Sequence, residues 1–342
     1  MSDLEKSILD FEIKSQRKIL SSSSELAVAA LSILKLCVSS SHSISDVQHN
    51  LMRVAKRLKK CSPYDVVVGN CCDRVLNTVN EEFEKSMKPS EFYSVKRSVS
   101  LLELFAQPLN PMKSDSFDED RSFKSSICRV IEDYIDEIPQ YFQDIAKSAK
   151  DFIHSGDIIM TIGKSKSTFA FFQRAVEKQR KFSVIIPEHA PSYDGITTAK
   201  ELRKIGVDVI VIPDSAVYAV MPKITAVIVP CRGVLADGNL ICTNYVLPIA
   251  MAAKKHAVPF IVLYWRWKLT EKFLKPGDSF TQLVSPLNAA GGNYDFTGKL
   301  QIFSPEGECV PGNLVKIYIN EEGPHGPADV FPLMQSIYHQ IE

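Results

Sequence analysis

Small polar and basic side chains follow the apolar run Ile158–Ile162, and they form the part of this chain best suited to chemistry. The run has no helical period and helical spacing resumes at Ser167, so we predict a buried strand, a turn and a helix start. Open parallel sheets bind ligands at the carboxyl ends of their strands, where backbone N–H groups and helix N-termini hold phosphate or sugar groups. The candidate ligand residues at this turn are Thr161, Gly163, Lys164, Ser165 and Ser167. The competing interpretation is that Ser167 is a helix N-cap and that the lysines are solvated.

Charged and amide side chains follow the later apolar runs and complete the predicted pocket. These further members are Glu188, Arg232, Asp237 and Asn239. His189 beside Glu188 has the chemistry of a general acid or base, but no serine or cysteine is placed to complete a nucleophilic triad. Asp237 and Asn239 flank a glycine, and this tripeptide is first of all a turn signal. The sequence contains neither G-x-G-x-x-G nor a P-loop, so we expect no cofactor.

Apolar β-rich runs alternate with helical segments in the second half of the chain. We predict strands at 158–162, 182–186, 207–212, 226–229, 260–263 and 315–319. Helices are predicted at 167–179, 197–205, 216–220 and 243–256, with a closing helix at 328–341. Such alternation is typical of an α/β, doubly wound parallel sheet with right-handed crossovers. We therefore expect a Rossmann-like domain over 156–342.

Residues 1–155 have no strand-like alternation and are predicted to form an all-helical domain. Apolar residues recur at helical spacing within 26–36, 47–58 and 67–79. A polar, proline-containing stretch at 88–120 is predicted as a loop, and 125–155 as a long connecting helix. Pro139 is expected to kink that helix or to begin a new one.

Composition excludes several classes of protein. The charges balance at 40 basic and 40 acidic residues, which gives no reason to expect nucleic acid or an anionic membrane as a partner. Charged residues occupy the start of the chain, so no signal peptide is expected, and no apolar run is expected to cross a bilayer. The eight cysteines form no C-x-x-C pair and accompany no histidine cluster, so we predict reduced thiols, no metal site and a cytosolic location.

Several segments together are similar to a known family. They are 157–163 (Asp-Ile-Ile-Met-Thr-Ile-Gly), 181–191 (Lys-Phe-Ser-Val-Ile-Ile-Pro-Glu-His-Ala-Pro), 218–221 (Tyr-Ala-Val-Met), 235–238 (Leu-Ala-Asp-Gly) and 68–70 (Val-Gly-Asn). They resemble the regulatory subunits of eukaryotic translation initiation factor 2B, the beta branch most closely. Those subunits share their fold with the methylthioribose-1-phosphate and ribose-1,5-bisphosphate isomerases. The resemblance covers roughly 65–86 and 125–342.

The same resemblance implies that the isomerase chemistry is lost. The isomerases carry a cysteine in the loop after the first strand, at the place of Gly163 here, and an aspartate after a later strand, at the place of Arg232. Moving a proton between adjacent carbons needs an acid and a base. Glycine has no side chain for this work, and an arginine is effectively always protonated. Cys231 is adjacent, but neighbouring residues of a strand point to opposite sides.

By resemblance, the chain is a noncatalytic subunit of the guanine nucleotide exchange complex for initiation factor 2. Its implied partners are the delta, alpha, gamma and epsilon subunits, with exchange carried out by epsilon, and it helps to sense phosphorylation of the alpha subunit of initiation factor 2 under stress. Members of the family pair through their Rossmann-like domains. The candidate interface residues are Tyr218, Met221, Asn320, Glu322 and Asp329.

Two other identities stay open at this point. The chain is an active sugar-phosphate isomerase if it turns over such a substrate. It is otherwise an alpha or delta subunit: a stable homodimer would favour alpha, whereas delta subunits carry a long basic N-terminal extension that this sequence does not show. Trp265 and Trp267 are either interface residues or core residues of a local loop, since tryptophan is enriched both at interfaces and in cores.

Overall fold

The structure is a computed structural model, and it describes residues 3–17, 19–20, 22–61, 65–86, 117–273, 281–285 and 301–338. The chain divides into two compact units, Met1–Ile138 and Pro139–Glu342. The division falls inside one helix, whereas strands begin to alternate with helices near residue 155, where we placed the domain border.

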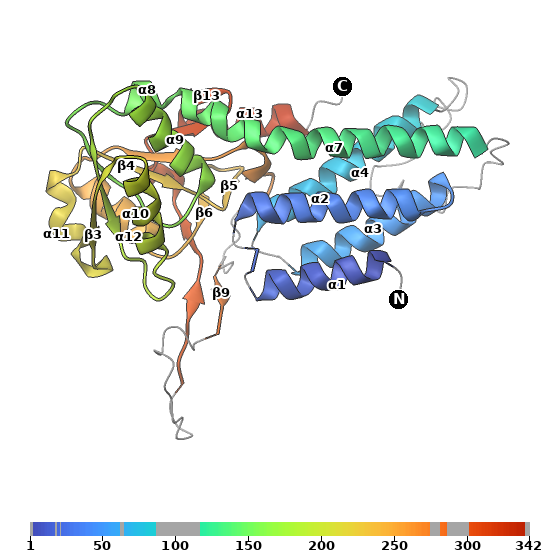
Figure 1. The fold of residues 1–342 in the computed structure, drawn as a ribbon, viewed down its shortest axis with the longest axis horizontal. Helices are drawn as coiled ribbons and strands as arrows, with labels where there is room; N and C mark the ends of the chain where they lie inside the picture. Colours follow the sequence, from blue (N-terminus) through green and yellow to red (C-terminus); the bar gives the residue numbers. More distant parts are fainter. Residues whose placement is uncertain are drawn as a thin grey trace. The chain divides into compact units, whose positions relative to one another are not determined.

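The described part of the first unit contains only helices (Figure 1). They are α1 (Asp3–Gln16), α2 (Ser23–Ser40), α3 (Ile44–Cys61), α4 (Val66–Ser86) and the first part of α7 (Phe117–Lys147). Helix α2 begins with a capping box, because Ser22 accepts from the Glu25 amide while the Glu25 carboxylate accepts from the Ser22 amide. Arg57 of α3 ties this helix to α1 through Glu5 at 2.8 Å and Glu12 at 3.0 Å.

Helix α2 corrects one expectation. With a mean hydropathy of 1.4 over 18 residues, it has the length and composition of a membrane-spanning helix, although we expected no such run. Half of it is buried inside the structure. The buried core helix of a water-soluble bundle has the same composition, so the helix is weak support for a membrane span.

The predicted loop and the proline break differ in part from the structure. Of the predicted loop 88–120, residues 88–116 lie outside the described residues, and Phe117–Asp120 are already helical. Helix α7 continues through Pro139 and ends at Lys147, and the short α8 (Ala149–Phe152) follows. The expectation of a new helix at Pro139 is therefore wrong, and the break comes nine residues later, after Ser148.

A seven-stranded sheet forms the centre of the second unit, in the order β13-β12-β7-β4-β1-β2-β3. Its strands are β1 (Ile158–Met160), β2 (Ser183–Pro187), β3 (Asp208–Ile212), β4 (Ala226–Pro230), β7 (Phe260–Leu263), β12 (Ile317–Asn320) and β13 (Gly323–His325). All neighbours are parallel except β12 and β13. The predicted α/β doubly wound sheet, with an all-helical region before it, is thus confirmed.

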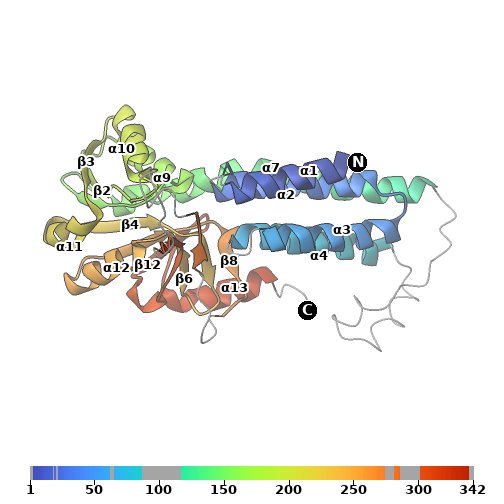
Figure 2. The same cartoon turned by 90° about the horizontal axis from the view of Figure 1, so that it is seen from below.

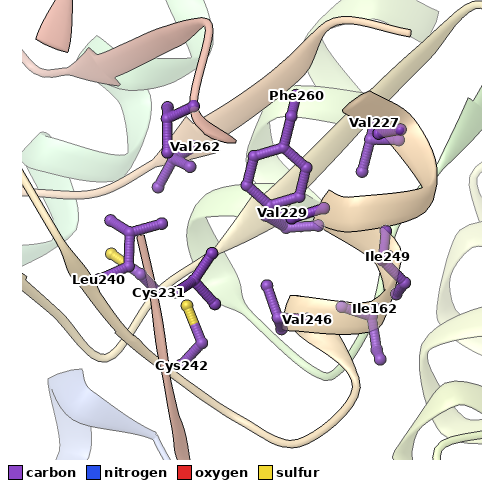
Figure 3. Close-up of a cluster of buried hydrophobic side chains, with 14 of the residues drawn as sticks. Ile162, Val227, Val229, Cys231, Leu240, Cys242, Val246, Ile249, Phe260 and Val262 are labelled. Carbon is purple, nitrogen blue, oxygen red and sulfur yellow. The ribbon is translucent and has the colours of Figure 1, made fainter. Parts of the chain in front are cut away.

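Helices cover both faces of this sheet (Figure 2). Helices α9 (Lys166–Glu177) and α10 (Asp194–Lys204) lie on one face, and α12 (Val246–Lys255) and α13 (Val330–Tyr338) lie on the other. A short η1–α11 segment (Asp214–Val220) follows β3. Figure 3 shows part of the core that results, in which side chains of β4, β7 and α12 pack together with Leu240 and Cys242.

Short strands outside the main sheet were missed by the sequence analysis. The strands of a second, four-stranded sheet are, in spatial order, β11 (Glu308–Val310), β6 (Leu240–Cys242), β5 (Gly233–Leu235) and β8 (Leu269–Thr270). A two-stranded ribbon joins β9 (Gln282–Leu283) to β10 (Pro305–Glu306). Two or three residues are too few to show an alternating pattern, so the sequence does not reveal these strands. Strands β5 and β6 pair across a short turn, whereas β8 and β11 pair with partners further along the chain.

Trp265 and Trp267, for which the sequence left an interface role and a core role open, are core residues within the region 264–300, whose structure the sequence did not predict. Trp265 is 1% exposed and Trp267 is 3% exposed, and their rings stack at 6.1 Å. Tyr141 and Phe142 of α7 each contact Trp265 with ring centroids 5.9 Å apart. Residues 274–280 and 286–300 of that region lie outside the described residues.

Candidate functional site

The predicted site residues follow neighbouring strands of the main sheet. Strand β1 lies between β2 and β4, so the turn after β1 lies beside Glu188 after β2 and Arg232 after β4. The parallel strands bring these segments to one edge of the sheet, as the alternating pattern predicts. Hydrogen bonding decides what each side chain does there.

The turn after β1 is held in a defined conformation. Gly163 has φ +73°, in the left-handed region, and its carbonyl accepts from the Thr198 hydroxyl of α10 at 2.9 Å. The N-cap of α9 is Ser165, whose hydroxyl accepts from the Thr168 amide at 3.4 Å. The interpretation of Ser167 as N-cap is therefore wrong by two residues. Ser167 is instead buried in the first turn of α9.

Lys164 has an ion-pair partner outside the turn. Its ammonium lies 3.2 Å from the Glu201 carboxylate of α10, and its side chain is 52% exposed. An exposed pair of this kind adds little stability. The interpretation of Lys164 as a solvated lysine fits this arrangement better than that of a ligand-binding lysine.

Two buried hydroxyls near this turn have no hydrogen-bond partner within the described chain. They belong to Thr161, which is fully buried at the end of β1, and Thr168, which is 4% exposed in α9. A buried polar group without a partner costs free energy. These two unpaired hydroxyls are groups at this edge of the sheet that could hydrogen-bond to a ligand.

Thr161→Val is expected to raise the free energy of unfolding by about 1 kcal/mol, because valine keeps the shape and removes the unpaired hydroxyl. Thr198→Val is the matched control and should lower it by about 1 kcal/mol, since its hydroxyl donates to Gly163. Urea unfolding of both variants measures the difference. A loss of stability in Thr161→Val would show that the hydroxyl is paired in the folded protein.

Asp214, after β3, organises the loop after β2. Its two carboxylate oxygens accept from the main-chain amides of His189 and Ala190, both at 2.8 Å. His189 has φ +62°, is 7% exposed, and shares a hydrogen bond of 3.2 Å between its Nδ1 and the Ser192 hydroxyl. These groups therefore hold the loop, and Glu188 beside them bonds through its main-chain amide to Ile212.

Burial gives His189 a pH signature. Desolvation lowers its pKa below the usual 6.5, although nearby Asp194 and Asp214 raise it. A histidine with a lowered pKa binds its proton more readily in the unfolded chain, so its contribution to stability is complete above about pH 6.5 and is lost as the pH falls.

His189→Asn is expected to weaken this pH dependence, because asparagine also tolerates a left-handed backbone but does not titrate. Urea unfolding from pH 8 to pH 5 measures the free energy of unfolding of the wild type and of the variant. The wild type should exceed the variant most at high pH, and the difference should shrink as the pH falls. A constant difference across this range would contradict the assignment.

Arg232 and Cys231 point in different directions at the end of β4. The Arg232 guanidinium lies 2.5 Å from the Glu306 carboxylate of β10, and both side chains are partly exposed. Cys231 is 4% exposed within the hydrophobic core (Figure 3), and burial raises the pKa of its thiol to about 11. The thiol is therefore protonated at neutral pH, and the expectation that it points away from the pocket is confirmed.

Asp237 and Asn239 form the turn between β5 and β6. The Asp237 carboxylate accepts from the Asn239 amide at 3.0 Å and from its side chain at 2.8 Å. The Asn239 side-chain oxygen accepts from the Gly312 amide at 2.9 Å, and the Tyr318 hydroxyl donates to Gly238. These contacts assign a turn-forming role to two residues that we predicted as pocket members.

The interface candidates have different environments. Tyr218 is 57% exposed, with its ring 5.0 Å from that of His256. Met221 is fully buried, so its prediction as an interface residue is wrong. The Asn320 side chain is buried and accepts from the Glu322 and Gly323 amides, whereas Glu322 pairs with Arg266. Asp329 accepts from the Gly326 amide at 2.9 Å in a short capping turn.

Sequence reasoning missed the exposed edge of the sheet. Strand β3 is an edge strand, and its Ile210 and Val211 are 53% and 42% exposed on opposite faces. The run 207–212 reads as a fully buried strand because a continuous apolar run carries no information about its neighbours. An uncovered apolar edge strand invites pairing with another chain.

Possible metal ligands do not cluster within the described parts of the chain. No group of three or more His, Cys, Asp or Glu side chains there could hold a metal ion. A cavity of about 420 Å³ lies in the helical unit, lined by residues of α1, α2 and the segment between them. None of the predicted pocket residues lines it.

Fold and site together define a Rossmann-like α/β protein whose strand-end side chains bond mainly to the chain itself. A family model described as the Initiation factor 2 subunit family matches residues 20–327. The chain therefore belongs to this family.

Relatives of two kinds resemble the chain. "Translation initiation factor eIF2B subunit beta" of Dictyostelium discoideum is 28% identical over 325 residues, 83% of this chain and 82% of the relative. "Ribose 1,5-bisphosphate isomerase" of Archaeoglobus fulgidus is 30% identical over 151 residues, 44% of this chain and 48% of that enzyme. A "tetrameric eIF2B-beta2-delta2 complex" from C. thermophilum contains a chain with the same fold (TM-score 0.74, 21% identity, 98% of this chain and 96% of that chain).

Proposed function

We propose that this chain is a noncatalytic regulatory subunit of the translation initiation factor 2B guanine nucleotide exchange complex, of the beta type. Relatives with the beta name match most of its length, which supports this reading over an alpha or delta identity. The observation that carries the noncatalytic part is at the strand ends. Gly163 stands in the β1 turn, and Arg232 is paired with Glu306.

Isomerase chemistry finds no support in these residues. Shifting a proton between adjacent carbons requires one group to accept it and another to donate it. The carboxylate of Asp214 is occupied by two main-chain amides, and the Cys231 thiol is buried with a raised pKa. Neither group is therefore placed to exchange a proton with a substrate.

The direct partner in this proposal is a delta subunit. A delta subunit of Dictyostelium discoideum is 26% identical over 216 residues, and the name of the fungal complex joins beta with delta. The exposed edge at Ile210 and Val211 offers apolar surface for such a partner. The proposed further partners are the alpha, gamma and epsilon subunits and the alpha subunit of initiation factor 2. The proposed location is the cytosol. Both proposals rest on the role of the family.

Native mass spectrometry of the chain alone and co-expressed with a delta subunit tests the proposal. A stable heteromer with delta, and faster GDP release from initiation factor 2 once the remaining subunits are added, is the expected result. A soluble homodimer indifferent to delta would contradict the beta assignment. Turnover of ribose 1,5-bisphosphate or methylthioribose 1-phosphate by the purified chain would contradict the noncatalytic assignment.

A further inference from the structure

The β9–β10 ribbon exposes apolar side chains on one face. Leu283 is opposite Pro305 in the antiparallel register. Phe303 lies two residues before Pro305, just outside β10, where the Val284 amide still donates to the Ser304 carbonyl, so the extended chain places Phe303 on the same face. Leu283 is 64% exposed and Phe303 is 68% exposed, the two highest values among the large hydrophobic side chains of the described residues. Ser304, on the other face, is 7% exposed and is therefore buried.

A ribbon of two short strands does not hold its own position. Each strand has two residues, and two-stranded ribbons are marginally stable in water by themselves. The apolar face adds no stability, because its side chains Leu283 and Phe303 are exposed and bury little area. The placement of the ribbon therefore comes from its continuity with β11 of the four-stranded sheet and from contacts made by the inner face.

Three consecutive sets of contacts fasten the segment 305–308. The Asn244 side chain donates to the Pro305 carbonyl at 2.7 Å and accepts from the Gly307 amide at 2.8 Å. Glu306 pairs with Arg232 at 2.5 Å. The Glu308 carboxylate accepts from the Leu247 amide at 2.5 Å at the start of α12, a helix whose own N-cap side chain makes no capping bond.

We propose that Arg232, Asn244 and Glu306 form a latch that holds the β9–β10 ribbon against the carboxyl edge of the main sheet. In this chain Arg232, which we predicted as a pocket residue, thus fastens a structural arm. The latch keeps Leu283 and Phe303 exposed in a fixed position.

The charged pair is the strongest part of the latch. Both side chains are about three-quarters shielded from solvent, with 25% of Arg232 and 20% of Glu306 exposed. A charge-assisted hydrogen bond with this shielding is stronger than an exposed ion pair. By contrast, the pair Arg203–Asp208 at 3.0 Å has exposed fractions of 62% and 84% and serves as a matched control.

Hydrogen exchange of single amides in the full chain tests the latch. The reporters are the Val284 amide, bonded to Ser304, and the Gly307 amide, bonded to Asn244. Arg232→Gln and Glu306→Gln should each speed exchange at both reporters about tenfold, since local opening becomes easier. Arg203→Gln should leave them unchanged. The Thr161 amide, bonded to Ile185 in the main sheet, is the internal reference.

A double-mutant cycle completes the test. If the two charges act through each other, Arg232→Gln with Glu306→Gln should exchange no faster than either single variant, and the swap R232E with E306R should restore most of the protection. Unchanged exchange in the single variants, additive effects in the double variant, or loss of protection at Thr161 as well would each overturn the proposal. None of these readouts depends on a partner subunit, so they are separate from the test of function.

Discussion

Gly195→Ala is expected to lower the free energy of unfolding by about 3 kcal/mol, because a β-carbon at this position would meet backbone that cannot move aside. An ideal Cβ would lie 2.0 Å from the Pro187 carbonyl oxygen and 3.0 Å from that of Glu188. Gly195 is in the first turn of α10, so the helix could not keep its place beside the end of β2. Urea unfolding of the purified chain measures the loss.

Gly69→Ala provides the control for this prediction. Gly69 lies inside α4 and an added Cβ would meet nothing within 4 Å. The same substitution should therefore stabilise the chain by about 0.5–1 kcal/mol through helix propensity. If Gly195→Ala costs less than about 1 kcal/mol, α10 does not approach β2 as closely as described.

Ile210→Lys is expected to weaken association with the delta subunit at least 30-fold, about 2 kcal/mol, if the edge of β3 is the pairing surface. A lysine there places a charge on the apolar edge strand, which is how natural edge strands avoid pairing. The stability of the lone chain should hardly change, since Ile210 is 53% exposed. Analytical ultracentrifugation of the mixed subunits measures the effect.

Ile13→Lys is the matched control for surface charge. Ile13 is 48% exposed on α1 in the helical unit, so its replacement changes charge and apolar area in a similar way. Association should then be unaffected. Equal weakening by both variants, or full association of Ile210→Lys, would remove the edge of β3 from the proposed interface.

The long elements could be read from the sequence because their signals are local. Six apolar runs became the six parallel strands, and the serine-rich segment before α2 supplied a capping box at Ser22 and Glu25. Element ends were less certain, as the N-cap at Ser165 and the uninterrupted α7 at Pro139 show. A proline inside a helix is tolerated where the surrounding structure offsets the lost hydrogen bond.

The roles of the site residues depended on contacts that no local pattern contains. Arg232 and Glu306 are 74 positions apart, and their pairing follows from the β9–β10 ribbon, whose strands are too short to be recognised. Met221 and Tyr218 belong to the same four-residue motif, yet Tyr218 is exposed and Met221 is fully buried. Asp237 and Asn239 carried a turn signal from the start, and the structure gives that turn its partners.

The alternation of strands and helices, the order of the two regions and the family could all be predicted from local patterns, because periodicity and short motifs are properties of neighbouring residues. Tertiary structure alone decided which polar groups remain unpaired, which apolar strand lies at an edge and which acid faces Arg232. The physical reason is that hydrogen bonding and burial depend on groups brought together in space, often from distant parts of the chain.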